Sequence, residues 1–192
     1  MNLPNQLTMS RLVLTGFFVA CFYTSWDNAY SIALLIFSVA SITDYLDGSI
    51  ARARGLVTNF GKLFDPLADQ ILIAAAFILL SWDHMIPAWV TIAILAREFF
   101  VTGIRLVAAG RGAVLAAEKL GKHKMMWQII TVLYFMLRAA SQEPMFGFFR
   151  SAFAPSTTHD WIASFIIGFT TLLTLVSGFS YFWKNRHLFD DA

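Results

Sequence analysis

The chain has 192 residues, of which 58% are hydrophobic and only 14% are charged. With a mean hydropathy of +0.64, it lacks the polar surface that a water-soluble domain of this size requires. The net charge of +2 is too small to indicate a nucleic-acid partner. The composition therefore predicts an all-α integral membrane protein, built as a single domain over residues 1–192. Its one cysteine, Cys21, lies in an apolar stretch and is interpreted as a packing residue.

Six stretches are apolar and long enough to cross a membrane as helices, which takes about 20 residues. Residues 1–11 precede them and predict a short helix along the membrane interface, with a disordered tail as the alternative. The first span lacks the pattern of a cleaved signal peptide, so we expect it to be retained. The loop 141–160 shows no visible chemistry and is interpreted as interfacial. The predicted spans are 12–23, 29–51, 60–82, 86–108, 120–140 and 161–183.

Basic residues are distributed unevenly between the predicted connections. Lys and Arg gather in segments 52–62, 105–124 and 184–186, whereas the turns 25–28 and 83–85 have none. Because basic connections stay on the cytoplasmic side, both termini and both basic connections are predicted to face the cytoplasm.

Four aspartates lie where the second predicted span leads into the third. Asp44 and Asp47 are three residues apart, and Asp65 and Asp69 are four apart. Positions at these spacings share one face of a helix. The connection between the two spans is short, so the helices should be antiparallel neighbours whose carboxylates converge near the cytoplasmic surface.

Such carboxylates must either stay protonated or be held by cations. All-oxygen ligation is preferred by Mg²⁺, Ca²⁺ and Mn²⁺, and two facing pairs resemble the sites that bracket two metals for phosphoryl transfer. Gly48, Ala51 and Gly61 leave room for a substrate or a partner helix, and Arg52 adds positive charge at the rim. A proton or cation pathway and a purely structural set of ion pairs are the alternatives. The clustering of the acids at one face favours a metal-dependent phosphate enzyme.

The fixed positions of this segment resemble the signature of the CDP-alcohol phosphotransferase family. The resemblance implies six helices, a homodimer, and a cytoplasm-facing site in the inner membrane of a bacterium. It also implies two Mg²⁺ or Mn²⁺ ions and transfer of a phosphoalcohol group from a CDP-linked donor to a hydroxyl. By position, Asp69 would be both metal ligand and general base. The other implied ligands are Asp44, Asp47 and Asp65, and the residues implied at the CDP end are Gly48, Ala51, Arg52 and Gly61.

Charged residues in the fourth and fifth spans bear on the second substrate. Arg97 and Glu98 are interpreted as a local or interhelical ion pair rather than as ligand contacts. Arg105, Lys122 and Lys124 predict a cationic pocket for a phosphorylated acceptor, with simple positive-inside topology as the alternative.

Three segments resemble one branch of the family, in which CDP-diacylglycerol reacts with sn-glycerol 3-phosphate to give phosphatidylglycerol phosphate and CMP. They are NLPNQLTMSR, AREFFVTGIR and GKHKMMWQ. The resemblance implies that Arg105, Lys122 and Lys124 hold the acceptor phosphate, while Asn5 and Thr8 border the donor site.

Two positions depart from that branch, since Met125 stands where threonine is usual and Gln70 where lysine is common. Serine, inositol phosphate and phosphatidylglycerol therefore remain alternative acceptors. A proton or cation transporter would require acids deeper in the bilayer than Asp69, and Glu98 alone qualifies.

Overall fold

The computed structural model describes residues 3–54, 59–112, 115, 119–154 and 156–186, with the backbone alone at 3–8, 44–54, 59–69 and 119. Within these ranges all regular structure is helical, which confirms the predicted all-α class. A short 3₁₀ turn, Gly147–Phe149, lies between the last two α-helices. The α-helices are α1 (Leu3–Cys21), α2 (Ala29–Arg54), α3 (Asn59–Trp82), α4 (Ala88–Gly110), α5 (Lys119–Ala140) and α6 (Thr157–Asn185).

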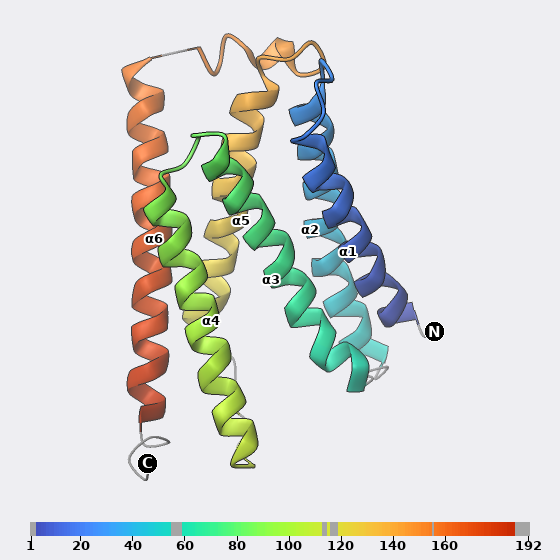
Figure 1. The fold of residues 1–192 in the computed structure, drawn as a ribbon, viewed down its shortest axis with the longest axis vertical. Coiled ribbons are helices and arrows are strands. Elements are labelled where there is room, and N and C mark those ends of the chain that lie inside the picture. Colours follow the sequence, from blue (N-terminus) through green and yellow to red (C-terminus); the bar gives the residue numbers. More distant parts are fainter. Residues whose placement is uncertain (1–2, 55–58, 113–114, 116–118, 155, 187–192) are drawn as a thin grey trace.

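The helices alternate in direction, so their junctions gather at two opposite ends of the molecule (Figure 1). At one end, called here the motif end, α2 ends and α3 begins, and α1 begins and α6 ends there as well. At the other, called the loop end, lie the α1–α2 and α3–α4 turns and the α5–α6 segment. α1 packs on both α2 and α3, α4 packs on α3 and α6, and α5 contacts α2, α3 and α6. α2 and α3 run in opposite directions, as expected from the sequence, whereas direct packing between them stays a prediction.

The turn at the loop end of α3 is closed by backbone hydrogen bonds. His84 adopts a left-handed backbone conformation with φ of 58°. The backbone N–H of Met85 donates to the carbonyl of Leu80 at 2.9 Å, and that of His84 donates to Ser81 at 3.1 Å. This pair of bonds satisfies the last carbonyls of the helix and reverses the chain. Pro87 then precedes α4 in an extended conformation, which fixes where that helix starts.

The α5–α6 segment, predicted to be a loop without visible chemistry, caps the start of α2. The carboxylate of Glu143 accepts hydrogen bonds from the backbone N–H groups of Tyr30 at 2.8 Å and Ser31 at 2.7 Å. It also accepts one from the Ser31 hydroxyl at 2.6 Å. Because a helix N-terminus exposes unpaired N–H groups and a positive dipole end, a carboxylate there is stabilising. Tyr30 in turn donates its hydroxyl proton to Asp83 of the α3–α4 turn.

Among the described side chains, the larger apolar cluster lies toward the loop end, and a smaller one joins α4 and α6. The largest fully buried side chains of the larger cluster include Phe18 of α1, Phe37 of α2 and Phe77 of α3. Cys21 belongs to the same cluster and is buried, which confirms its interpretation as a packing residue.

The N-terminal prediction needs correction, because α1 is one continuous helix from Leu3 and not an interfacial helix followed by a separate span. No glycine or proline interrupts residues 5–15, and Pro4 lies in the first turn, where the missing N–H is tolerated. The last helix begins at Thr157, before the predicted residue 161, because Ser156 caps it by accepting from the N–H of His159. The other observed helices match the predicted spans to within about three residues.

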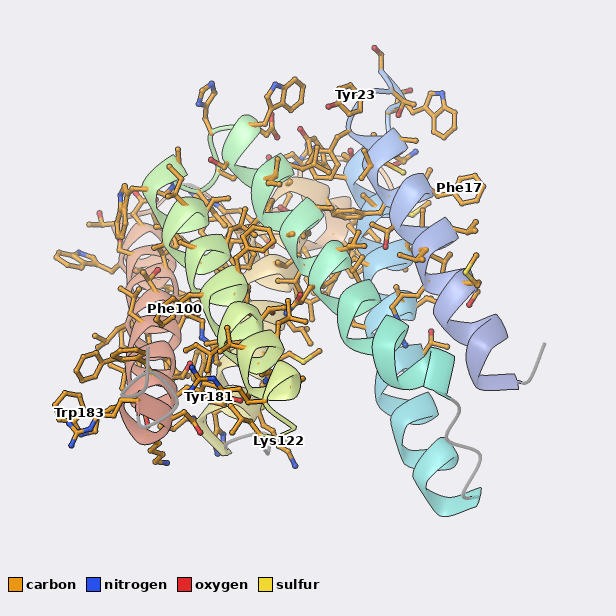
Figure 2. The ribbon with its side chains drawn as sticks, turned by 60° about the horizontal axis from the view of Figure 1, so that its bottom comes forward. Phe17, Tyr23, Phe100, Lys122, Tyr181 and Trp183 are labelled. Carbon is orange, nitrogen blue, oxygen red and sulfur yellow. The ribbon has the colours of Figure 1, made fainter. Side chains whose placement is uncertain are left out.

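Among the described residues, α6 is the one helix both long enough and apolar enough throughout to cross a membrane. Shorter apolar stretches are Met9–Cys21, Ala29–Thr43 and Gln70–Trp82. Large apolar side chains nevertheless cover the outer faces of other helices, and Figure 2 shows Phe17 of α1 and Trp183 of α6 pointing away from the bundle. The number of membrane crossings therefore stays a prediction.

Candidate active site

The aspartate motif lies on two helices that meet at the motif end. Asp44 and Asp47 fall within α2, and Asp65 and Asp69 within α3, as the spacing argument required. Each pair therefore shares one face of its helix. Their side chains lie outside the described residues, as do those of Gly48, Ala51, Arg52, Gly61, Asn5 and Thr8. The convergence of the four carboxylates stays a prediction.

A cavity of about 330 Å³ is lined in part by the residue that follows the last aspartate. Gln70 lines it from α3, and its side-chain amide donates to the hydroxyl of Thr102 on α4 at 3.0 Å. The described lining of the cavity therefore includes the neighbour of Asp69 in the chain. Its other lining residues come from α3 (Ile71, Ile73, Ala74), α4 (Ile94, Leu95, Arg97, Glu98, Phe99, Val101, Arg105), α5 (Gly121, Lys122, Lys124, Met125, Gln128) and α6 (Tyr181).

The three residues predicted to hold an acceptor phosphate all line this cavity. Arg105 is fixed from α6, because its Nε donates to the Tyr181 hydroxyl at 3.2 Å and its guanidinium lies 5.4 Å from the centre of that ring. Tyr181 itself is buried, and Figure 2 shows it turned inward between the motif-end halves of α4 and α6. Lys122 is exposed, whereas Lys124 is only 7% exposed. The structure brings the three cations together, and their role in phosphate binding stays a prediction.

A buried ionic network links α4, α5 and α6 beside the cavity. Lys124 forms a salt bridge with the carboxylate of Glu98, and Arg97 lies 3.3 Å from the same carboxylate. The other terminal nitrogen of Arg97 donates to the hydroxyl of Ser177 on α6 at 2.8 Å. These contacts confirm the interpretation of Arg97 and Glu98 as an ion pair, both within α4 and between helices.

The packing of Arg97 explains a glycine in α6. A Cβ placed on Gly178 would lie 2.7 Å from Cγ of Arg97, too close for any other residue without a shift of the arginine. The absent side chain therefore lets α6 approach α4 closely enough for Ser177 to reach the guanidinium.

The charges around the cavity do not cancel. Four cationic side chains line it against the single carboxylate of Glu98 among the described lining residues. One carboxylate cannot neutralise four cations, so the described lining keeps a net positive charge that attracts an anion. The lining of Ile, Leu, Val and Phe side chains lowers the local dielectric and strengthens any such attraction.

Sequence reasoning missed Thr102, Gln128, Ser177 and Tyr181, which the fold places around this site. Neutral polar residues in a predicted span do not stand out as charged residues do. Tyr181 resembles the aromatic residues that commonly lie at the membrane interface. A helical-periodicity test could have found Gln128, because it lies four residues after Lys124 and hence on the same face.

The chain is similar to several known proteins. A family model described as CDP-alcohol phosphatidyltransferase matches residues 1–176. A protein of Bacillus subtilis (strain 168), named CDP-diacylglycerol–glycerol-3-phosphate 3-phosphatidyltransferase, is 41% identical over 196 aligned positions that cover 96% of this chain and 95% of the relative. A protein of Rickettsia felis with the same name is 33% identical, covering 98% of this chain and 97% of the relative. A third of that name, from Salmonella typhimurium, is 34% identical over 71% of this chain and 78% of the relative. The chain belongs to the CDP-alcohol phosphatidyltransferase family.

Proposed function

We propose that this protein transfers the phosphatidyl group of CDP-diacylglycerol to sn-glycerol 3-phosphate, releasing CMP and forming phosphatidylglycerol phosphate. Relatives that bear the name of this reaction align with nearly the whole chain. The observation that carries the proposal is the cationic cavity, which is lined by Gln70, the residue after Asp69, and by Arg105, Lys122 and Lys124. A cavity of this charge suits an acceptor that already carries a phosphate.

The aspartate motif supplies a donor set that suits a hard divalent cation. Four carboxylates in two helical pairs offer the all-oxygen ligation typical of Mg²⁺ and Mn²⁺. We therefore propose that Asp44, Asp47, Asp65 and Asp69 hold two such ions. When bound, the ions neutralise charge on the diphosphate of the donor and on departing CMP. Gly48, Ala51, Arg52 and Gly61, with Asn5 and Thr8 of α1, border the CDP end of the donor.

The reacting atoms would meet where α3 faces the cavity. The oxygen of the acceptor's primary hydroxyl bonds to the phosphorus that carries the diacylglycerol, and the bond from that phosphorus to the CMP oxygen breaks. Asp69 accepts the hydroxyl proton, a role that requires hydrogen-bond reach to that oxygen. Arg105, Lys122 and Lys124 hold the acceptor phosphate and so orient the hydroxyl toward the donor.

The cavity disfavours free serine as the acceptor and disfavours a transport function, but it is compatible with inositol phosphate. Free serine carries no phosphate for the three cations to bind, whereas inositol phosphate would use similar basic residues. A proton or cation transporter would need Glu98 as its deeper acid, but Arg97 and Lys124 already engage that carboxylate. The geometry therefore favours a phosphorylated acceptor.

The surface supports a membrane location with the site at one edge of the bilayer. The six helices have 19 to 29 residues, or roughly 28 to 44 Å at 1.5 Å per residue, against a hydrocarbon thickness of about 30 Å. We propose six crossings, with the motif end at the cytoplasmic face as its basic residues predict. We also propose a homodimer, which the molar mass of the detergent-solubilised protein tests.

The test is an assay of purified protein in detergent with CDP-diacylglycerol, Mg²⁺ or Mn²⁺, and separate acceptors. CMP release that requires both the metal and glycerol 3-phosphate is the expected result. Release with serine alone would contradict the acceptor assignment, and absence of CMP release with every acceptor would contradict the reaction class.

A further inference from the structure

Gln128 lies in the acceptor cavity with an unused hydrogen-bond donor. It lines the cavity from α5, is 1% exposed, and its Nε2 finds no hydrogen-bond partner among the described residues. Because buried polar groups are almost always paired, an unpartnered amide at the wall of a cavity indicates a ligand or water that pairs with it.

Three other polar side chains of the wall have hydrogen-bond or ion-pair partners within the protein. The amide of Gln70 donates to Thr102, Lys124 pairs with Glu98, and Arg105 donates to Tyr181. Gln128 lies one turn beyond Lys124 on the same face of α5, about 6 Å further from the motif end. Long side chains on a helix lean toward its N-terminus, which directs the amide from this position back toward the level of Lys124.

The acceptor of the proposed function has one polar group without an assigned partner. Its phosphate meets the cations and its primary hydroxyl meets Asp69, which leaves the secondary hydroxyl at C2. A hydroxyl oxygen accepts from an amide N–H, and a glutamine oxygen accepts the hydroxyl proton in return.

We propose that Gln128 is a specificity-determining residue whose Nε2 donates a hydrogen bond to the C2 hydroxyl of the acceptor. The inference rests on the proposed function. It adds that the site prefers acceptors with a hydroxyl on the carbon next to the one that bears the attacking hydroxyl. A site that pairs a hydroxyl discriminates against an analogue lacking it, since the buried amide is then left without a partner.

The experiment compares glycerol 3-phosphate with 3-hydroxypropyl phosphate, which has the same phosphate and primary hydroxyl but no C2 hydroxyl. Wild-type protein should prefer glycerol 3-phosphate by about 10- to 100-fold in kcat/KM. Gln128→Met should lose about that factor with glycerol 3-phosphate and treat the two acceptors nearly alike, with the KM for CDP-diacylglycerol unchanged. If Gln128→Met fails to fold, Gln128→Asn, whose amide is one methylene shorter, serves in the same comparison.

Thr131→Val is the matched control on α5. Thr131 is fully buried, its hydroxyl bonds to Thr170 at 2.8 Å, and it does not line the cavity. This variant should keep the wild-type preference between the two acceptors. A Gln128 variant that slows both acceptors equally would overturn the inference while leaving the proposed function standing. Wild-type protein that uses neither acceptor would overturn both.

Discussion

The two ends of the bundle are held together by different forces. At the loop end the side chains of α1 to α5 form a continuous apolar core, and the connecting segments cap helices through Glu143 and Ser156. Toward the motif end α4, α5 and α6 are joined by the ionic network of Arg97, Glu98 and Lys124 around a cavity. Among the described side chains, the loop end is packed and the motif end is open around a charged cavity.

This difference teaches where the protein can accommodate a polar substrate. Charged side chains in the wall of a cavity are costly to bury, so the fold there depends on pairing them. The packed end supplies a rigid base from which the helices project toward the motif. Changes at the loop end should therefore alter stability without altering turnover, whereas changes at the motif end can alter either.

Asp69→Asn should have the largest effect on turnover. The amide keeps the size of the side chain but cannot take a proton, so CMP release should fall by about 10²- to 10⁴-fold. Turnover is measured with CDP-diacylglycerol and glycerol 3-phosphate, and circular dichroism checks that helix content is retained. Activity within a few-fold of wild type would remove Asp69 as the base.

Glu98→Gln tests the ionic network at the open end. Without the carboxylate, Arg97 and Lys124 are left buried with no counter-charge from Glu98, which should lower the unfolding free energy by about 3 kcal/mol. The apparent Tm in detergent should fall by several degrees. An unchanged Tm would show that the network contributes nothing to holding α4, α5 and α6 together.

The helices and the charged residues that line the cavity could largely be predicted from the sequence. Apolar length predicted the bounds of α2 to α6 to within about four residues, because a helix in an apolar environment needs a continuous run of apolar side chains. The spacing of the four aspartates placed each pair on one face. Arg105, Lys122 and Lys124 were identified because charge in a membrane segment requires an explanation.

What could not be predicted depends on contacts between residues distant in the chain. Glu143 caps α2 from more than a hundred residues away, and no local pattern links the two. Tyr181 and Ser177 reach α4 only because α6 packs closely at Gly178. The continuity of α1 was missed because hydropathy, which falls before residue 12, does not report where a helix begins.

Arg105→Gln should weaken acceptor binding. Losing one cation from the cavity should raise the KM for glycerol 3-phosphate by about 10-fold, the effect of one charged hydrogen bond, and raise that for CDP-diacylglycerol much less. Steady-state kinetics with each substrate varied in turn measures the two values. Equal increases in both would place Arg105 outside the acceptor site.

Glu143→Gln makes the same chemical change at the packed end as Glu98→Gln makes at the open end. The amide retains one acceptor for the N–H groups at the start of α2 but loses the charge that favours the helix dipole, at about 1 kcal/mol. The Tm should fall less than in Glu98→Gln, while kcat/KM for both substrates should stay at wild-type values. A larger Tm loss than in Glu98→Gln would reverse the comparison between the two ends.

Arg138→Gln should have the smallest effect of the series. Arg138 lies 3.3 Å from Asp160 at the loop end, where the arginine is partly exposed and the aspartate is exposed. An ion pair of this kind contributes less than about 1 kcal/mol, since water and salt screen the charges. The Tm should therefore change by a degree or two at low salt and by less in 0.5 M NaCl, with turnover unaffected. A loss as large as that of Glu98→Gln would mean that exposed charges at the packed end stabilise the bundle as much as buried ones beside the cavity do.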